Sequence, residues 1–293
     1  MNKKHILITG ANGQLGHEMQ NVLAGNEAFE ALPTDVAELD ITNAEAIEAF
    51  FSQHQVDYLV NCAAYTAVDK AEDNPELCQK LNAEAVALLA HACHKHGAKM
   101  VQISTDYVFG GTGYRPYQET DDPDPQSVYG TTKLDGEHRL LAEAPESIII
   151  RTAWLYSPYG HNFVKTMMTL PATHPQLKVV ADQVGSPTYA LDLANAIMAF
   201  VTAPEWHNGI YHFSNEGVIS WYDFTKAIHE IAGIGSCKVI PCDTDDYPTR
   251  ATRPHYSVLS KNKIKATLGI DVPYWRDSLK HCIARINQDN ANQ

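Results

Sequence analysis

A glycine-rich segment near the N-terminus, TGANGQLG from Thr9 to Gly16, restricts the fold of this chain more than any other segment. It follows a short apolar run and precedes a stretch with apolar residues at helical spacing. Gly10, Gly13 and Gly16 permit a tight turn, close approach of a pyrophosphate, and close packing of the helix on the strand. The helix N-terminus adds free N–H groups and a positive dipole end. The segment therefore predicts a dinucleotide site at a first βα turn; a glycine-rich turn without ligand is the alternative.

Apolar runs and helical patterns continue to alternate along the first half of the chain. The expected strands span residues 5–9, 29–32, 58–61, 99–104 and 148–152, and the expected helices span 13–24, 44–54 and 75–96. Strands that are apolar throughout indicate a parallel sheet covered on both faces, so we predict an α/β, Rossmann-type doubly wound sheet. After Trp154 the alternation fades. We expect a dinucleotide-binding domain over 1–150 and a smaller mixed α/β, mainly substrate-binding domain over 151–293, with some segments returning to the first domain.

An acidic residue follows the expected second strand at the spacing typical of a ribose contact. Asp35 lies 19 residues after Gly16, where a carboxylate accepts hydrogen bonds from the adenosine ribose. Asp40 competes for this role, and a solvated loop Asp is the alternative. No Lys or Arg directly follows Asp35 to pair with a 2′-phosphate. The segment favours NADH, although NADPH stays open.

Tyr129 and Lys133 are four residues apart in VYGTTKLDGE, so a helix places both side chains on one face. A free tyrosine has a pKa of about 10, and a nearby ammonium lowers it. Such a tyrosine exchanges a proton with a carbonyl oxygen while a hydride moves to the carbon. Tyr and Lys also fall four apart by chance. The prediction of a reductase site therefore depends on two further features. One is the glycine-rich loop, and the other is Thr105, which stands at the end of a strand and offers a hydroxyl to the carbonyl oxygen.

Composition and charge exclude several other classes of protein. The 293 residues include 22 Lys and Arg against 35 Asp and Glu, a net charge of −13, which disfavours nucleic acid and anionic membranes as partners. The longest apolar stretch, 193–204, is too short to span a bilayer. The N-terminal apolar run breaks at Gly10 and has no cleavage site, so we expect a cytoplasmic protein. Six scattered cysteines without a CxxC pair predict no metal site.

Further motifs give the chain a resemblance to a known family. They are NCAAYTAVDKAE (61–72), STDYVFGG (104–111), PxxxYGxTKLxGE (125–137), RTAWLY (151–156) and DQxGxPT (182–188). With the glycine-rich loop they resemble the extended short-chain dehydrogenase/reductases, and among these the dTDP-4-dehydrorhamnose reductases, over nearly the whole chain. The resemblance implies hydride transfer from NADH or NADPH to the 4-keto carbon of dTDP-4-dehydro-L-rhamnose. The product, dTDP-L-rhamnose, would serve cell-surface polysaccharide such as lipopolysaccharide.

The resemblance also implies roles for matching residues. Tyr129 would donate the proton, and Thr105 would hydrogen-bond the 4-keto oxygen. Lys133 would adjust the pKa of Tyr129 and hold the nicotinamide ribose. The loop and the resemblance together place the cofactor on Gly10, Gly13, Gln14, Leu15, Gly16, Asp35, Asp40, Ile41, Ala63, Ala64 and Tyr65, besides Tyr129 and Lys133. The nucleotide-sugar substrate is expected on Thr105, Asp106, Trp154, Asp69 and Arg253.

Alternatives remain for several of these residues and for the function. Trp154 also suits an aromatic at a domain interface, Asp69 a surface ion pair, and Arg253 a structural salt bridge. Tyr107 stands where related dehydratases carry a carboxylate, which disfavours elimination of water. A non-catalytic regulatory subunit of the methionine adenosyltransferase type is one alternative function. Reduction of another nucleotide-linked 4-keto sugar is the other.

Some family members bind magnesium with carboxylates of adjoining subunits at a dimer contact. Glu18 occupies one such position. Leu191 stands where a Glu is expected, and Asp192 is displaced by one residue, which turns a side chain by about 100 degrees on a helix. We therefore predict no metal ion, and formation of a homodimer stays open.

Overall fold

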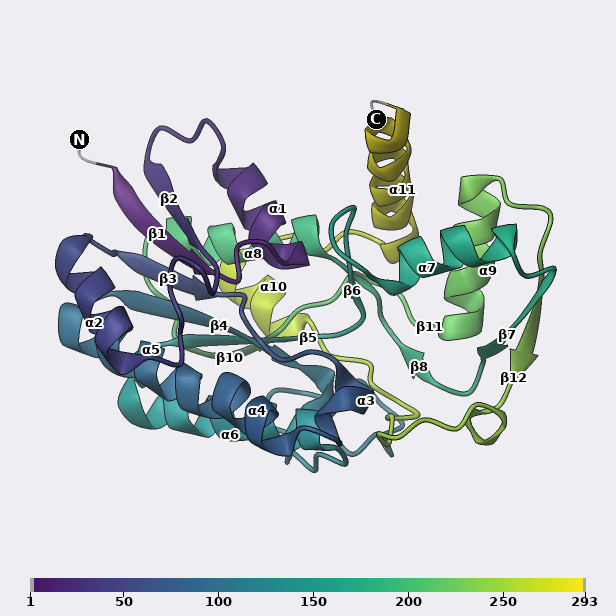
Figure 1. Ribbon diagram of the computed structural model, residues 1–293, viewed down its shortest axis with the longest axis horizontal. Coiled ribbons are helices and arrows are strands. Elements are labelled where there is room, and N and C mark those ends of the chain that lie inside the picture. The colour runs from purple at the N-terminus through teal and green to yellow at the C-terminus, as the bar shows by residue number, and fades with distance from the viewer. Residues whose placement is uncertain (1–2, 292–293) are drawn as a thin grey trace.

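A parallel sheet of six strands forms the centre of the structure, a computed structural model that describes residues 3–291 (Figure 1). The strands lie in the order β2–β1–β3–β4–β5–β10, and every neighbouring pair is parallel. Their bounds are β1 Lys4–Thr9, β2 Phe29–Thr34, β3 Tyr58–Asn61, β4 Lys99–Thr105, β5 Ile148–Thr152 and β10 Gly209–His212. The sheet confirms the predicted Rossmann-type fold. Its strand order reverses between β1 and β3, where such sheets bind ligands.

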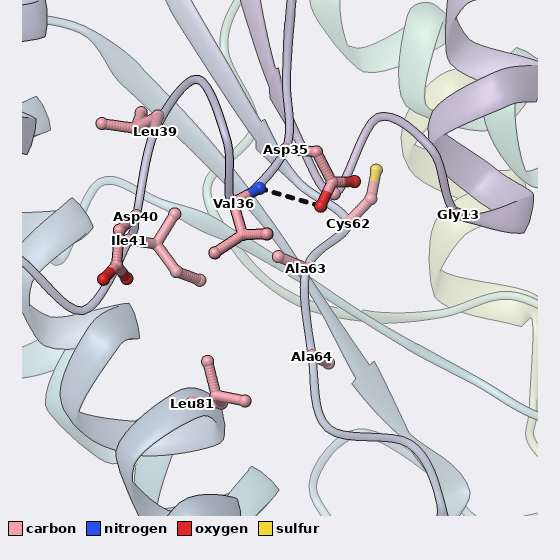
Figure 2. A pocket seen from close by; sticks show the side chains of 11 residues that line it. Gly13, Asp35, Val36, Leu39, Asp40, Ile41, Cys62, Ala63, Ala64 and Leu81 are labelled. Atoms are coloured by element: carbon pink, nitrogen blue, oxygen red, sulfur yellow. Dashed lines mark hydrogen bonds between the residues drawn. The ribbon is translucent and has the colours of Figure 1, made fainter.

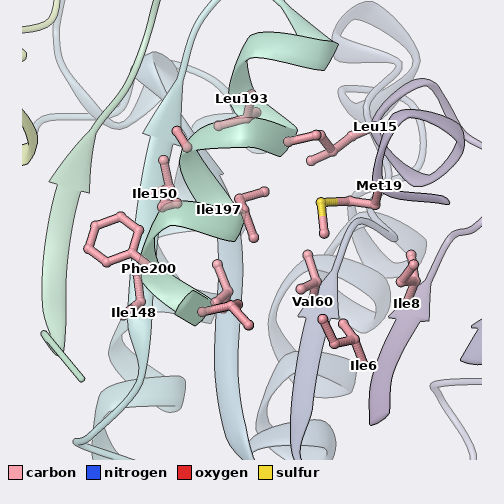
Figure 3. Close-up of a cluster of buried hydrophobic side chains, with 14 of the residues drawn as sticks. Ile6, Ile8, Leu15, Met19, Val60, Ile148, Ile150, Leu193, Ile197 and Phe200 are labelled. Carbon is pink, nitrogen blue, oxygen red and sulfur yellow. The ribbon is translucent and has the colours of Figure 1, made fainter. Parts of the chain in front are cut away.

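Helices cover both faces of this sheet, and successive strand residues alternate between the faces. One face packs against α1 (Gln14–Leu23), α8 (Ala190–Thr202) and α10 (Asn262–Leu268), and the other against α2 (Ala44–Gln53), α5 (Ala85–His96) and α6 (Val128–Glu143). On β5, Ile148 and Ile150 lie in the first cluster, shown in Figure 3, and Ile149 lies in the second. Because both faces are buried here, all five residues of β5 are buried, and three of them are isoleucine.

The remaining elements form a smaller mixed part with its own apolar core. Three short strand pairs hold it together: β6 (Leu155–Tyr156) with β9 (Thr188–Tyr189), β7 (Gln176–Val180) with β12 (Lys238–Cys242), and β8 (Val184–Gly185) with β11 (Ile219–Ser220). Its helices are α7 (Phe163–Thr169), α9 (Trp221–Ala232) and α11 (Trp275–Ala291). Tyr156, Phe224 and Trp275 lie in its core. In contrast, β10, α8 and α10 belong to the first sheet and its covering helices, although all three follow residue 151.

The segment expected as one regular helix over 75–96 contains a wider turn. It consists of α4 (Pro75–Gln79), a π-helical turn (Lys80–Glu84) and α5. This turn lies against α6, where a Cβ on Gly136 would collide with the carbonyl oxygen of Asn82. Such π-helical turns occur often at functional sites, and Leu81 in this one reaches the cavity described below.

The shorter helical segments are α3 (Val68–Ala71) and 3₁₀ turns at Asp106–Val108, Leu170–Ala172 and Thr244–Asp246. The longest apolar stretch of the sequence lies in α8, whose Leu193, Ile197 and Phe200 are buried against the sheet. Within residues 3–291, no helix combines the length and the apolar character needed to cross a bilayer.

Candidate active site

A cavity of about 350 Å³ lies where the strand order reverses, beside the segments that follow β1, β2 and β3 (Figure 2). Seven residues predicted for the cofactor line it: Gly10, Gly13, Asp35, Asp40, Ile41, Ala63 and Ala64. Four that sequence analysis missed also line it: Val36, Leu39, Cys62 and Leu81. Apolar walls with two carboxylates suit a flat base attached to a hydroxyl-bearing ribose.

Two glycines of the loop stand where a side chain would collide with neighbouring backbone. Gly10 has a φ of +65°, and a Cβ on it would lie 2.7 Å from the backbone nitrogen of Ala63. A Cβ on Gly16 would lie 2.6 Å from the Cα of Ala11. Gly10 therefore lets β1 turn beside β3, and Gly16 lets α1 pack on the turn. No side chain within the described chain caps α1 at Gly13, so its first N–H groups remain available to an anion.

The two carboxylates of the cavity are held by neighbouring donors. Asp35 accepts from the backbone N–H of Asn12 at 3.1 Å and of Val36 at 2.8 Å, the second of which is drawn in Figure 2. Asp40 accepts from the hydroxyl of Thr42 at 2.7 Å and its N–H at 2.9 Å, and these hydrogen bonds hold the pKa of Asp40 below its usual range. Both carboxylates keep further lone pairs for hydroxyl donors. Among the described lining residues, none is a Lys or Arg.

Six of the predicted cofactor residues do not line the cavity: Gln14, Leu15, Gly16, Tyr65, Tyr129 and Lys133. The side chain of Leu15 is buried in the core, so only its backbone can contact a pyrophosphate. Gln14 is bonded to a loop of the smaller part. Tyr65 exchanges two hydrogen bonds with Asn82: its N–H donates at 2.8 Å, and its carbonyl accepts at 3.1 Å. Sequence analysis missed Asn82, which nothing in its local pattern distinguishes.

The predicted catalytic residues come from α6 and the end of β4. Ser127 caps α6 by accepting from the N–H of Gly130 at 3.1 Å, which starts the helix just before Tyr129. One turn later, the buried Lys133 donates to the carbonyl oxygen of Ile103 at 2.6 Å. Thr105 ends β4 and accepts from the N–H of Tyr107 at 3.2 Å. Helix and strand therefore meet with Tyr129, Lys133 and Thr105 on the facing sides.

The pKa values at this site differ in part from expectation. Burial raises the pKa of Tyr129, and hydrogen bonding with Thr105 opposes that rise. The Lys133 ammonium is not among the causes that act on the Tyr129 pKa, so the expected lowering is not found. Burial lowers the pKa of Lys133 itself to about 8, with the charge of Glu137 opposing.

Asp106, expected to contact substrate, lies beneath Thr105. Its carboxylate accepts from the Thr105 hydroxyl at 3.0 Å, and burial raises its pKa to about 6. Only 2% of the residue is exposed, so in this conformation it reaches a substrate through Thr105 and not directly. Its Oδ2 atom is buried without a hydrogen-bond partner among the described residues.

Trp154 follows β5 and adopts a left-handed backbone, with a φ of +49° that is rare for a bulky side chain. Its indole stacks on Trp221, with ring centroids 3.6 Å apart. A Cβ on Gly185 would lie 2.8 Å from the Trp154 ring, which explains the glycine of the DQxGxPT motif. Trp154 is half-buried and packs both against the core of the smaller part and against the cluster of Val108, Phe109, Ala153 and Leu259.

The two charged residues predicted for substrate binding contact one another. Arg253 donates to both carboxylate oxygens of Asp69, at 3.0 and 2.7 Å. The hydrogen bond from Arg253 holds the pKa of Asp69 below its usual range. Asp69 also accepts from the N–H of Ala251 at 3.2 Å. This arrangement matches the alternatives given from the sequence, an ion pair for Asp69 and a structural salt bridge for Arg253. It connects α3 to the loop that contains Ala251 and Arg253.

A buried ion pair holds α6 against the sheet. Arg151 on β5 donates to both carboxylate oxygens of Glu137, at 3.0 and 2.7 Å, and Ser104 donates to the same carboxylate at 2.5 Å. Arg151 and Glu137 are 2% and 1% exposed. Because Ser104 precedes Thr105 and Glu137 lies one turn after Lys133, this pair fixes the helix against the strand that carries the catalytic residues.

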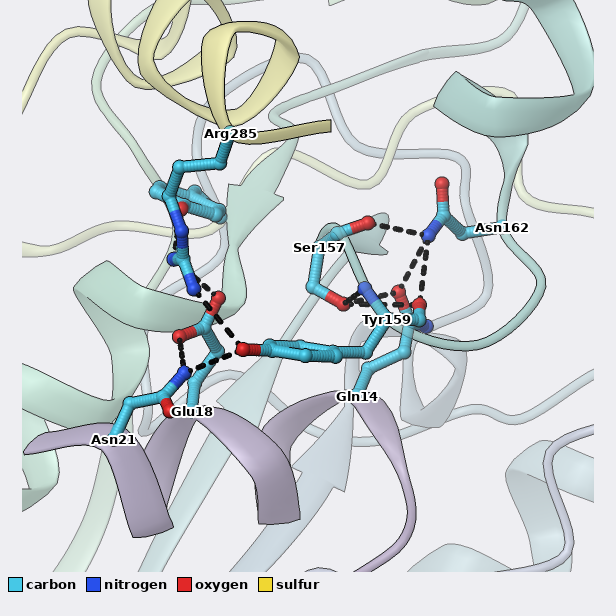
Figure 4. Close-up of polar contacts among 8 residues, drawn as sticks. Gln14, Glu18, Asn21, Ser157, Tyr159, Asn162 and Arg285 are labelled. Atoms are coloured by element: carbon cyan, nitrogen blue, oxygen red, sulfur yellow. Dashed lines mark hydrogen bonds and ion pairs between the residues drawn. The ribbon is translucent and has the colours of Figure 1, made fainter. Parts of the chain in front are cut away.

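The carboxylates considered for magnesium have other partners. Glu18 is buried and accepts from Arg285 at 2.7 Å (Figure 4). Asp192 accepts from Asn215 at 2.6 Å and Ser278 at 2.5 Å. Over the described range, no three His, Cys, Asp or Glu side chains gather as a metal-binding set.

Known proteins are similar to this chain in sequence and in architecture. A dTDP-4-dehydrorhamnose reductase of Aggregatibacter actinomycetemcomitans is 40% identical over 285 residues, covering 94% of this chain and 97% of that protein. The crystal structure of one from Clostridium acetobutylicum has a TM-score of 0.93 at 47% identity and covers 97% of this chain and 99% of that one. That of one from Bacillus anthracis, in complex with NADP, has a TM-score of 0.93 at 38% identity and covers 97% and 100%.

The family model described as the RmlD substrate binding domain matches residues 4–288. It therefore spans both the sheet and the smaller part. The match confirms the resemblance to dTDP-4-dehydrorhamnose reductases that the motifs indicated. This chain belongs to the RmlD substrate-binding family.

Proposed function

We propose that this chain is an NADPH- or NADH-dependent reductase of dTDP-4-dehydro-L-rhamnose. The product is dTDP-L-rhamnose, a precursor for polysaccharide. The family and the NADP complex of the Bacillus anthracis relative support the substrate and the cofactor. The observation that carries the proposal is the meeting of Tyr129, Lys133 and Thr105 at the end of β4, on the sheet edge that holds the cavity.

Each residue at this meeting point has a distinct task in the reduction of a ketone. The nicotinamide, when bound, supplies a hydride to the 4-keto carbon. Tyr129 donates its phenolic proton to the oxygen, on which negative charge develops. The Thr105 hydroxyl donates its one proton to the same oxygen after it turns away from the Asp106 carboxylate. Burial holds Tyr129 protonated before the reaction, which suits a proton donor.

Lys133 lies one helical turn from Tyr129 and serves the cofactor side. One of its three N–H donors is used by Ile103, so two remain for the nicotinamide ribose. Gly10, Gly13 and the first N–H groups of α1 bind the pyrophosphate. Asp35 and Asp40 accept from the adenosine ribose, beside Ile41, Ala63, Ala64 and Tyr65.

The substrate occupies the space between the sheet and the smaller part in this proposal. Trp154, stacked on Trp221, lies beside the nucleotide sugar in this proposal. Arg253 binds the diphosphate, because a guanidinium matches phosphate oxygens in two-point contacts. Asp69 orients Arg253, and Asp106 orients Thr105.

The proposal includes a division of labour along the chain. Residues 1–150 bind the dinucleotide on a sheet that β10, α8 and α10 complete, and the remainder of 151–293 binds the nucleotide sugar. It includes a cytoplasmic location. Whether the chain forms a homodimer is to be measured by sedimentation. The regulatory-subunit function is a competing outcome of the assay below.

The test is nicotinamide absorbance over time with purified protein and freshly generated dTDP-4-dehydro-L-rhamnose. NADH and NADPH are run in parallel. We expect decay that depends on the sugar nucleotide, and the two rates rank the cofactors. Protein that binds a dinucleotide but gives no decay with either would contradict the proposal, and would favour another keto sugar or a regulatory subunit.

A further inference from the structure

A loop of the smaller part lies on the first helix of the sheet. The loop SPYGHN, residues 157–162, contacts one face of α1 (Figure 4). Tyr159 stacks on His17 with ring centroids 4.5 Å apart, and its hydroxyl accepts from Asn21 at 2.9 Å. Arg285 of α11 donates to that hydroxyl at 3.3 Å and to Glu18 at 2.7 Å. The loop is therefore fixed to α1 over two helical turns.

The first residue of this face is Gln14, at the start of α1 and directly after Gly13. Its amide oxygen accepts from the Nδ2 of Asn162 at 2.9 Å and from the Oγ of Ser157 at 3.2 Å. Gly160 lies against its stem, since a Cβ there would be 3.4 Å from the Cγ of Gln14. Two donors on one oxygen leave the Gln14 Nε2 facing the other way, with no acceptor among the described residues.

The orientation of the Asn162 side chain is determined by its second role, as the N-cap of α7. Its Oδ1 accepts from the N–H of Lys165 at 3.2 Å as the N-cap of α7, so its Nδ2 is the atom left to face Gln14. That Nδ2 also donates to the carbonyl of Ser157 at 2.8 Å. Asn162 is 7% exposed and Ser157 is fully buried. An amide flip at Asn162 would break these contacts together.

We propose that Asn162, with Ser157, is a positioning residue that turns the Gln14 amide so that its N–H₂ group faces the pyrophosphate. This inference rests on the proposed dinucleotide function. An N–H₂ group at a phosphate donates a charge-assisted hydrogen bond, whereas the carbonyl oxygen would be repelled. The loop of the smaller part thus determines affinity for the cofactor without touching it.

The test compares dissociation constants for NADPH in wild-type protein, Asn162→Asp, Gln14→Ala and the double variant. Asp is a good N-cap, so α7 keeps its cap, while its second oxygen attracts the Gln14 N–H₂ and turns the amide around. We expect Asn162→Asp to bind about tenfold more weakly, the loss of one hydrogen bond to a charged group. Turnover at saturating NADPH stays within about twofold, since no reacting atom is touched.

In the Gln14→Ala background, Asn162→Asp is expected to change the constant by less than about twofold, because the amide it acts through is gone. Asn21→Ala is the matched control: it removes another loop contact on α1 and should lower the melting temperature without changing NADPH affinity. Gln14→Glu is a second variant that folds, since acids suit the first turn of a helix. Its free carboxylate oxygen should weaken NADPH binding more than Gln14→Ala does.

Three results would overturn the inference. They are unchanged NADPH affinity in Asn162→Asp, an undiminished effect in the double variant, or unchanged affinity in Gln14→Glu. Each assumes wild-type protein that binds NADPH. Wild-type protein that binds neither NADPH nor NADH would instead refute the proposed function, and the inference with it.

Discussion

Lys133 donates a 2.6 Å hydrogen bond to the carbonyl oxygen of Ile103, two residues before Thr105 on the same strand. The bond joins the helix that carries the proton donor to the strand that carries the second hydroxyl. Because Lys133 is only 4% exposed, its ammonium needs a hydrogen-bond partner other than water, and the Ile103 carbonyl is that partner.

The burial of Lys133 predicts a pH dependence. Burial lowers its pKa from 10.5 to about 8, so the charged form is lost at a lower pH than for a lysine in water. Since the proposed contact needs the ammonium, kcat/KM for NADPH should fall as pH rises through about 8. In Lys133→Arg the charge persists, so the fall of kcat/KM with rising pH should disappear even if the rate is lower. A flat wild-type profile from about pH 7 to 9 would contradict the role.

The Glu137–Arg151 pair predicts a large loss of stability on removal of one charge. Glu137→Gln leaves the buried guanidinium without its counter-charge, and we expect the free energy of unfolding in urea to fall by about 3–5 kcal/mol. Arg139→Gln is the control, because Arg139 pairs with Asp135 at an exposed position and should cost less than about 1 kcal/mol. Equal losses in the two variants would refute the structural role of the buried pair.

Gly136 predicts a steric effect where α6 meets the π-helical turn. Gly136→Ala places a Cβ against the carbonyl oxygen of Asn82, and we expect the free energy of unfolding to fall by about 1–3 kcal/mol. The control is Gly235→Ala, whose added Cβ has no atom within 4 Å. A Gly136→Ala protein as stable as this control would show that the contact between the two helices relaxes freely.

Arg253 predicts a selective effect on the nucleotide sugar. Arg253→Met removes a guanidinium from the edge of the site, and KM for the sugar nucleotide should rise about tenfold, as for one lost charged hydrogen bond. The dissociation constant for NADPH should not change. Arg250→Met is the control, since Arg250 pairs with Asp73 and is 67% exposed in its side chain. An equal rise in KM for both variants would argue against a specific contact.

The sequence predicted the sheet well because the information for it is local. The bounds of β3 and β5 match the apolar runs 58–61 and 148–152, and the cavity gathers most of the residues expected for a dinucleotide. Glycine spacing and strand ends determine that edge, and both are visible in the sequence.

The parts that could not be predicted depend on contacts between distant residues. Arg253 and Asp69 are 184 positions apart, and nothing in either segment indicates that they pair. The bonding of Gln14 to Asn162 is of the same kind. The π-helical turn lies where Asn82 packs against α6, a contact that the alanine-rich pattern does not encode. The lowering of the Tyr129 pKa by Lys133 was expected from spacing alone, whereas the burial that raises this pKa depends on the folded surroundings.

The most direct test of the account compares wild-type protein with Tyr129→Phe in the reduction of dTDP-4-dehydro-L-rhamnose by NADPH. The substitution removes only the hydroxyl that donates the proton. We expect kcat to fall at least about 100-fold, as for the loss of a general acid, while the dissociation constant for NADPH is unchanged. Turnover of Tyr129→Phe within a few-fold of wild type would contradict the central claim that Tyr129 protonates the sugar oxygen.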